Sequence, residues 1–167
     1  VQIHGGMGYS AEMMVDRGYR DSRINRIFEG TNEINRLLIL DNVLKKGAKG
    51  ILPINEEAEK AFEEIKNLKD VKKGEQEYYE EKAGYIANFK KLILMIVKAA
   101  SDKFTRTIVM EQEILSAISD AVMQLYAAES LMIRIKKIES LKGEDELKVY
   151  RDILDVFVYN AASIIGK

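Results

Sequence analysis

A carboxylate, an apolar pair and a backbone break occur together in the segment SRINRIFEGTNEINR. Ile27 and Phe28 precede Glu29, Gly30 interrupts the backbone, and Thr31 is a suitable N-cap for a new helix. A carboxyl group held among apolar side chains has a raised pKa, and a general base works best when its pKa is near the operating pH. The alternative is a solvated loop carboxylate, favoured by about 0.3–1 kcal/mol at the positive end of the following helix.

A glycine-rich segment and a series of arginines are the other groups that could bind a ligand. Gly5, Gly6 and Gly8 follow no predicted strand and precede no Lys-Ser/Thr pair, so they match neither a dinucleotide-binding turn nor a P-loop. We interpret them as a helix end and a tight turn. Arginines interleaved with aspartates predict a ladder of ion pairs on one helix edge and leave anion binding open. The arginines are Arg17, Arg20, Arg23 and Arg26.

The elements that position these groups are predicted to be helices. Apolar residues follow helical spacing, and few β-branched runs leave little room for strands. We expect a helix end over residues 1–8, an amphipathic helix over 12–22 and a helix over 31–46, with Gly47 and Gly50 at its end. The predicted apolar face of the last helix, with one polar interruption, consists of Ile34, Leu37, Leu38, Asp41 and Leu44.

The composition becomes acidic after residue 54. Residues 56–82 contain ten acidic and six basic side chains, a balance poorly suited to anionic lipid or to phosphate backbones. We expect a solvated amphipathic helix here, followed by a polar connection near Gly74. Its apolar stripe consists of Ala58, Ala61, Phe62, Ile65 and Leu68.

Three long stripes of apolar residues occupy the rest of the chain. Turns near residues 105 and 143 would fold the three helices into an antiparallel bundle, so the predicted fold class is all-α. The stripes are predicted to form a core rather than a cofactor slot, because inward polar groups are not seen at facing positions. The stripes are Ile86, Phe89, Ile93, Ile96, Ala100 and Phe104; Ile114, Ile118, Ala121, Leu125, Ala128, Met132 and Ile135; and Leu147, Tyr150, Leu154, Phe157, Ala161 and Ile164.

The composition limits the classes of function. The 167 residues, 47% of them hydrophobic and 32% charged, suffice for one globular domain with a core. A formal net charge of -1 gives no field for nucleic acid, and the absence of cysteine excludes thiol catalysis. One histidine, His4, provides no cluster for zinc or iron, and the apolar runs are too short for a membrane span, so we expect no membrane association. Because the chain starts at Val1 rather than Met, we expect it to be part of a longer protein.

Three sequence blocks stand in order within the first 35 residues: QIHGGMGY at 2–9, YRDSRI at 19–24 and RIFEGTNEI at 26–34. Together, and in their spacing, they closely resemble the C-terminal signature of the acyl-CoA dehydrogenases. Residues 51–167 extend beyond the short members of that family. The run IVMEQE at 108–113 and the helix through Tyr126 resemble the extra helical domain of the very-long-chain type.

The resemblance implies a role for individual residues. Glu29 stands where the family has the base that removes the α-proton of a fatty acyl-CoA thioester, while FAD accepts the β-hydride. Gly30 would offer a backbone contact near the thioester. The implied cofactor-binding residues are Thr31, Asn32 and Glu33, which would line the FAD of the same subunit, and Gln2, Ile3, His4, Gly5 and Gly6, which would contact the FAD of the neighbouring subunit across a dimer interface.

The resemblance also implies partners and a domain division. It implies fatty acyl-CoA as substrate, electron-transfer flavoprotein as acceptor, a homodimer or homotetramer, and a bacterial cytoplasmic or mitochondrial matrix location. Residues 1–50 would be the end of the family's C-terminal helical domain, and residues 51–167 an appended helical bundle. The family's N-terminal helical and middle β domains hold the flavin ring and much of the substrate. We find neither here, so we expect the isolated chain neither to hold FAD tightly nor to turn over substrate.

Two alternatives remain open at this stage. Acyl-CoA oxidases and enoyl-CoA reductases share the scaffold and the base, and residues 1–50 do not decide among these activities. Residues 54–167 could instead form a helical module for oligomerisation or docking, without activity of its own.

Overall fold

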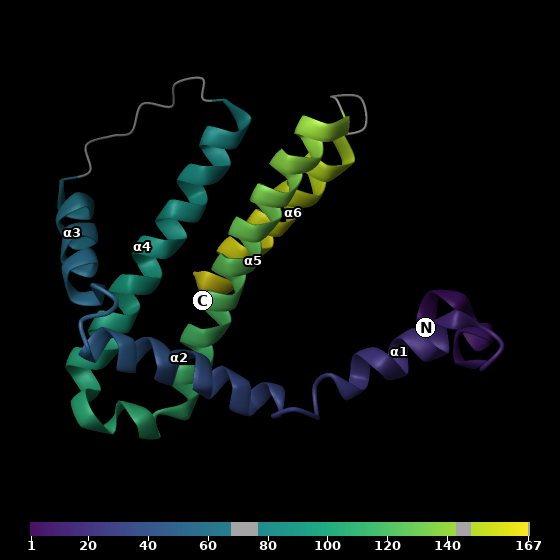
Figure 1. Ribbon diagram of the computed structural model, residues 1–167, viewed down its shortest axis with the longest axis horizontal. Coiled ribbons are helices and arrows are strands. Elements are labelled where there is room, and N and C mark those ends of the chain that lie inside the picture. The colour runs from purple at the N-terminus through teal and green to yellow at the C-terminus, as the bar shows by residue number, and fades with distance from the viewer. Residues whose placement is uncertain (68–76, 143–147, 167) are drawn as a thin grey trace.

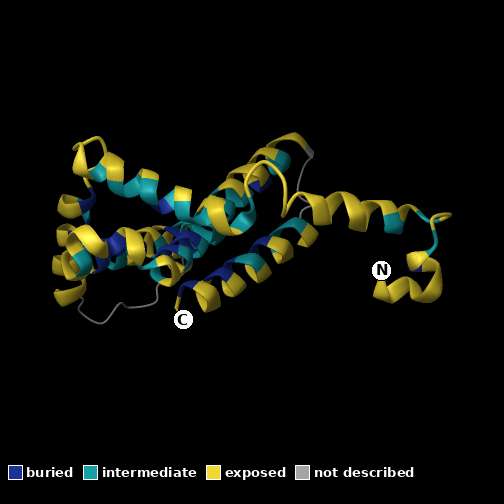
Figure 2. Ribbon diagram, turned by 90° about the horizontal axis from the view of Figure 1, so that it is seen from below, coloured by how far each residue is buried: buried dark blue, intermediate teal, exposed yellow. Residues whose placement is uncertain are grey.

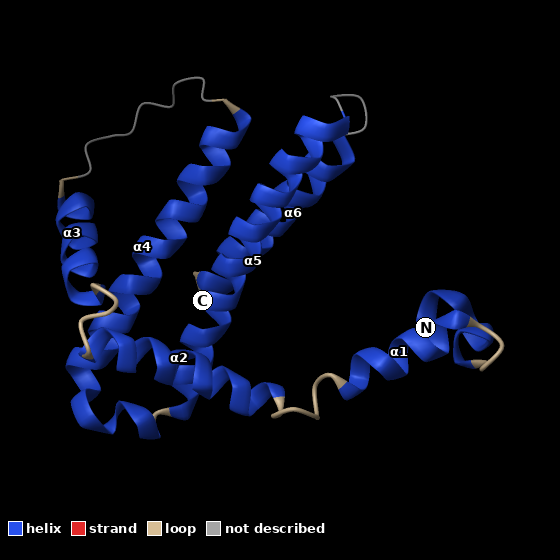
Figure 3. Ribbon diagram, viewed as in Figure 1, coloured by secondary structure: helices blue, strands red, loops and turns tan. Residues whose placement is uncertain are grey.

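The computed structural model describes residues 1–67, 77–142 and 148–166, and every regular element in these ranges is a helix (Figures 1 and 3). The all-α fold predicted from the sequence is therefore confirmed. In chain order the helices are η1 Gln2–Tyr9, α1 Met14–Ile24, α2 Asn32–Ala48, α3 Ile54–Lys66, α4 Tyr78–Phe104, η2 Thr105–Met110, α5 Gln112–Lys142 and α6 Lys148–Ile165, where η marks a 3-10 helix.

The predicted elements occur close to their expected places. The helix predicted over 12–22 is α1, the one predicted over 31–46 is α2, and the turn predicted near residue 105 is η2. Three other predictions lie outside the described residues: the connection near Gly74, the turn near residue 143, and the burial of Leu68 and Leu147.

Helices α4, α5 and α6 run antiparallel in succession and form the body of the molecule (Figure 1). Helix α3 packs against α4, and α2 crosses the end of the bundle in contact with α5. Helices η1 and α1 form an arm, residues 1–25, that extends away from this body (Figure 1). The chain thus consists of a packed bundle and an arm that joins it through the loop between α1 and α2.

The buried residues gather where the bundle helices face one another (Figure 2). A large core cluster includes Ile93, Val97 and Ile118, and a smaller cluster contains Ile135 and Leu154. Apart from Val97, which follows the predicted Ile96, these residues belong to the predicted apolar stripes, whose spacings of three and four are expected for helices that each bury one face. In contrast, α1 has no buried residue.

The predicted apolar face of α2 is confirmed at Leu37 and Leu44, which pack against the core, but not at Ile34 and Leu38. Leu40 is fully buried, whereas Leu38 and Ile34 are 49% and 51% exposed. The run LLIL at 37–40 places apolar residues on two neighbouring faces of the helix, so the sequence pattern fits burial of either face. Packing against α5 buries the face that contains Leu40. A similar one-residue shift occurs in α6, where Ile165 is buried and Ile164 is 42% exposed.

Candidate active site

Glu29 and Gly30 lie in the loop that joins α1 to α2, and both have left-handed backbone geometry. Their φ angles are +59° and +86°, and beyond the loop α2 continues away from α1 rather than folding back along it (Figure 1). Glycine adopts this conformation freely, but for a residue with a Cβ it costs about 1–2 kcal/mol. Two hydrogen bonds close the loop: Asn32 N–H donates to the Arg26 carbonyl at 3.2 Å, and the Asn35 side-chain amide donates to the Gly30 carbonyl at 2.9 Å.

The start of α2 is fixed by its own cap. The Thr31 hydroxyl accepts a hydrogen bond from the Ile34 N–H at 3.3 Å, which confirms the N-cap predicted for Thr31. In the first turn, a backbone hydrogen bond to the Glu33 carboxylate lowers its pKa, and the Thr31 hydroxyl, Arg26 and Arg36 add to this effect. The helix N-terminus therefore presents N–H groups, two polar side chains and a carboxylate beside the loop.

The apolar cleft expected around Glu29 is not formed by this chain's described residues. Glu29 is exposed, and its neighbours Ile27 and Phe28 are 52% and 49% exposed. Within this chain the loop therefore matches the solvated alternative, and the role of Glu29 as a base stays a prediction. The break itself, a carboxylate between two helices, is as predicted.

The glycine segment lies at the far end of α1 from the Glu29 loop (Figure 1). Residues 2–6 are exposed and belong to η1, where Gly5 has φ +56° and ψ -142°. An 11-residue helix separates η1 from the loop, which corresponds to about 16 Å. Within one chain, residues 29–33 therefore lie together, and residues 2–6 lie apart from them at the other end of α1.

The ladder of ion pairs predicted on α1 is represented by a single ion pair. Arg17 and Asp21, one helical turn apart, lie 3.8 Å from each other and are both largely exposed. Exposed pairs of this kind contribute little to stability. The arginine series consequently leaves a basic, solvent-facing edge on the arm.

A polar clamp ties α2 to α5, and the sequence did not predict it. The Arg36 guanidinium forms an ion pair with Asp120, Nε to Oδ1 at 2.6 Å. The hydroxyl of Ser119, which is fully buried, donates to the Arg36 carbonyl at 2.6 Å. These contacts fix the second turn of α2 on the bundle, four residues after the first residue of that helix.

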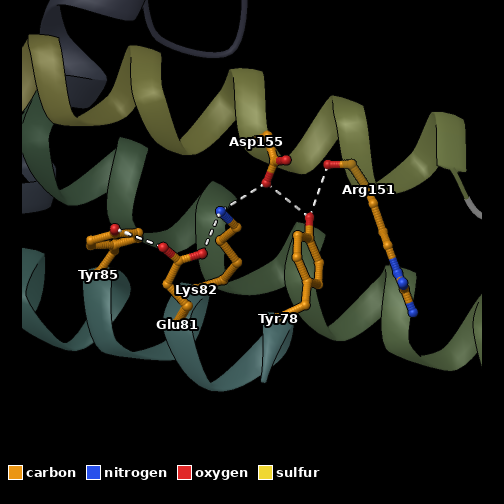
Figure 4. Close-up of polar contacts among 6 residues, drawn as sticks. All are labelled: Tyr78, Glu81, Lys82, Tyr85, Arg151 and Asp155. Carbon is orange, nitrogen blue, oxygen red and sulfur yellow. Dashed lines mark hydrogen bonds and ion pairs between the residues drawn. The ribbon is translucent and has the colours of Figure 1, made fainter. Parts of the chain in front are cut away.

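A second polar cluster joins α4 to α6 at the opposite end of the bundle (Figure 4). The Tyr78 hydroxyl lies 2.9 Å from the Arg151 carbonyl and 3.0 Å from the Asp155 carboxylate, which also pairs with Lys82 at 3.0 Å. Neighbouring Tyr79 and Arg151 both donate to Glu139 of α5. No inward polar groups were predicted at facing positions of these helices, and this prediction was wrong. Most of these groups pair with one another across three helices, although the buried Nε of Arg151 has no hydrogen-bond partner among the described residues, and we interpret the cluster as structural.

Tyr78→Phe should change how stability depends on pH. Burial, and then the hydrogen bond to Asp155, raise the pKa of Tyr78 above its ordinary value. Because the folded pKa is raised, the contribution is full below the unfolded pKa of about 10 and is lost as the pH rises above it. We therefore expect Tyr78→Phe to cost about 1–2 kcal/mol at pH 8 and less at pH 10.5.

Urea unfolding of the purified chain at the two pH values measures this difference. Tyr159→Phe is the matched control, because the Tyr159 ring is 77% exposed on α6. A Tyr78→Phe cost that stays constant between pH 8 and pH 10.5 would contradict the assignment.

In the described part of the chain, no group of three or more histidine and acidic residues is arranged to hold a metal, and no helix is long and apolar enough to cross a membrane. A groove of about 570 Å³ runs between α4 and α6, lined by Phe89, Val158 and neighbouring residues. It lies on the bundle, away from the loop that carries Glu29.

Comparison with known proteins agrees with this architecture. Residues 1–44 and residues 88–167 each match a family described as the acyl-CoA dehydrogenase C-terminal domain. A probable acyl-CoA dehydrogenase of Bacillus subtilis is 42% identical over 165 residues, which cover 96% of this chain and 27% of that protein. The caffeyl-CoA reductase-Etf complex subunit CarC of Acetobacterium woodii is 50% identical over 46 residues, 28% of this chain and 12% of that protein.

A solved structure extends the agreement to the backbone. The crystal structure of an acyl-CoA dehydrogenase complexed with FAD from Bacillus anthracis has a TM-score of 0.86 and 41% identity, covering 98% of this chain and 27% of the other. The fold is thus that of the helical C-terminal portion of such a flavoprotein. The chain belongs to the acyl-CoA dehydrogenase family. It spans about 27% of the length of the Bacillus relative and of the solved structure.

Proposed function

We propose that this chain is the C-terminal part of an FAD-dependent acyl-CoA dehydrogenase that oxidises fatty acyl-CoA thioesters, with Glu29 as the base. The observation that carries the proposal is the loop: Glu29 is exposed, and its backbone is held in a left-handed turn directly before a capped helix. A base must reach the proton that it abstracts, and a fixed, accessible carboxylate meets that requirement.

The Glu29 carboxylate would take the proton from the α-carbon of the thioester, and the electron pair released there would form the double bond to the β-carbon. FAD, when bound, accepts the hydride that leaves the β-carbon, so the products are an enoyl-CoA and reduced flavin. The Gly30 N–H or carbonyl would contact the substrate near the thioester. The Glu29 carboxylate thus has one chemical role, a single proton transfer.

The residues proposed for FAD fit such a group. Thr31, Asn32 and Glu33 stand at the N-terminus of α2, where free N–H groups favour polar or anionic ligand atoms. Gly5 and Gly6 have open space where a Cβ would stand, so their backbone can approach a ligand closely. We propose that residues 31–33 contact the flavin of the same subunit and that residues 2–6, which include Gln2, Ile3 and His4, contact the flavin of a neighbouring subunit.

Several finer points remain proposals. We propose a homodimer or homotetramer, electron-transfer flavoprotein as acceptor, and a bacterial cytoplasmic or mitochondrial matrix location. The similarity to a subunit of a caffeyl-CoA reductase-Etf complex supports a flavoprotein partner, and it also keeps the reductase direction as an alternative. The very-long-chain subtype and the domain boundary at residue 50 also stay predictions.

The test uses the full-length protein that contains this chain. Purified protein should carry about one FAD per subunit, and an anaerobic titration with saturated fatty acyl-CoA esters of different lengths should bleach the flavin absorbance. Flavin that no saturated acyl-CoA reduces, but that NADH or reduced electron-transfer flavoprotein reduces before an enoyl-CoA reoxidises it, would favour the reductase. Protein with no flavin would favour a helical docking module, for which the exposed apolar residues Ile153 and Val156 of α6 offer a surface.

A further inference from the structure

We infer that Asn35 is a positioning residue for Glu29, acting through the Gly30 carbonyl. This inference rests on the proposed function, because it concerns the placement of the base. Asn35 does not touch the reacting atoms; it holds the backbone of the residue that follows Glu29.

Both polar atoms of the Asn35 side-chain amide lie close to the backbone of Gly30. The side-chain Nδ2 of Asn35 donates to the Gly30 carbonyl oxygen at 2.9 Å, across five residues of chain. The Oδ1 of the same amide would lie 2.9 Å from a Cβ at Gly30. The amide of Asn35 therefore lies directly against the Gly30 backbone, and any residue other than glycine at that position would collide with it.

The loop needs such a contact because of its backbone geometry. Glu29 has φ +59°, which side chains with a Cβ rarely adopt, and a residue in such a conformation stays there only when its surroundings hold it. The Asn32 N–H bond to the Arg26 carbonyl closes one side of the loop. The hydrogen bond from the Asn35 side-chain amide to the Gly30 carbonyl holds the other side of the loop, next to Glu29.

Asn35 is exposed, and α2, which carries it, is held on the bundle through the next residue. The backbone N–H of Asn35 donates to the Thr31 carbonyl at 2.9 Å in the first turn of α2. The next residue, Arg36, is fixed by the ion pair with Asp120 and by the buried Ser119 hydroxyl. A continuous set of contacts thus leads from α5 through α2 to the loop. Asn35 is the member of this set that contacts the loop with its side chain.

The experiment replaces Asn35 in the full-length enzyme. Asn35→Leu keeps the size of the side chain and removes the donor. We expect kcat for acyl-CoA oxidation to fall about 10–100-fold, as for a catalytic group displaced by about 1 Å, with KM within about threefold and flavin content unchanged. Asn35→Gln, which keeps an amide donor, should recover most of kcat.

Asn42→Leu is the matched control. Asn42 lies on the same helix and its Nδ2 donates to the Leu38 carbonyl at 2.8 Å, but the bond stays within α2. We expect Asn42→Leu to leave kcat within twofold of the parent. If Asn35→Leu does not yield folded protein, Asn35→Asp, which has nearly the same shape and lacks the donor, takes its place with the same expected loss.

Three results would overturn the inference: kcat of the Asn35 variant within twofold of the parent, an equal loss in Asn42→Leu, or a loss that tracks flavin content with kcat per flavin unchanged. Failure of the proposed function is distinguishable from these. In that case the unmodified full-length protein itself would not have its flavin bleached by any saturated acyl-CoA.

Discussion

Glu29→Gln should lower the turnover of the full-length enzyme by about 10²–10⁴-fold while FAD stays bound. Glutamine has the shape of glutamate but cannot accept the α-proton, so the substitution removes the base and keeps the loop. The φ of +59° at this position is no harder for glutamine than for glutamate, so the backbone should be retained. Stopped-flow measurement of flavin reduction by acyl-CoA gives the rate, and the visible spectrum gives the flavin content.

Glu12→Gln is the control for this substitution. It removes a carboxylate of the same arm, at an exposed position 17 residues before Glu29, and should leave the rate within twofold of the parent. Flavin reduction in Glu29→Gln within about tenfold of the parent would place the base on another residue.

Leu40→Ala should destabilise the isolated chain by about 2–5 kcal/mol, the usual cost of emptying a fully buried leucine site. Leu40 is 0% exposed and belongs to the large core cluster, through which α2 packs on the bundle. Leu38→Ala is the matched control on the same helix, because Leu38 is 49% exposed, and it should cost about 1 kcal/mol or less.

Urea unfolding followed by helical circular dichroism gives both values. The pair also tests the face of α2, since the apolar pattern alone predicted Leu38 and the structure buries Leu40. Equal costs for the two variants would contradict the packing of α2 described here.

The sequence predicted most of the fold because its signals are local. Apolar residues at spacings of three and four identified the buried faces of α4, α5 and α6, including Ile93, Ile118 and Leu154. Thr31 as an N-cap and the glycine after Glu29 marked the start of α2. Each of these features is decided within one or two turns of helix, so one sequence contains them.

The features that escaped prediction depend on residues far apart in the chain. Arg36 and Asp120 pair across 84 positions, and Tyr78 meets Asp155 across 77. No periodicity reveals which polar residues of separate helices will face each other. The sequence left two alternatives open for Glu29, a carboxylate among apolar side chains and a solvated one, because the burial of a loop depends on what lies opposite it.

The arm limits what thermal unfolding can show about variants of this protein. A helix of 11 residues that shares no core with the bundle is marginal in water, so it melts independently of the cooperative transition of the bundle. A melting temperature therefore reports on the packed bundle and does not detect changes in the loop. Substitutions in the loop that abolish activity would leave the melting temperature unchanged. Substitutions that lower the melting temperature would report on the packing of the bundle only.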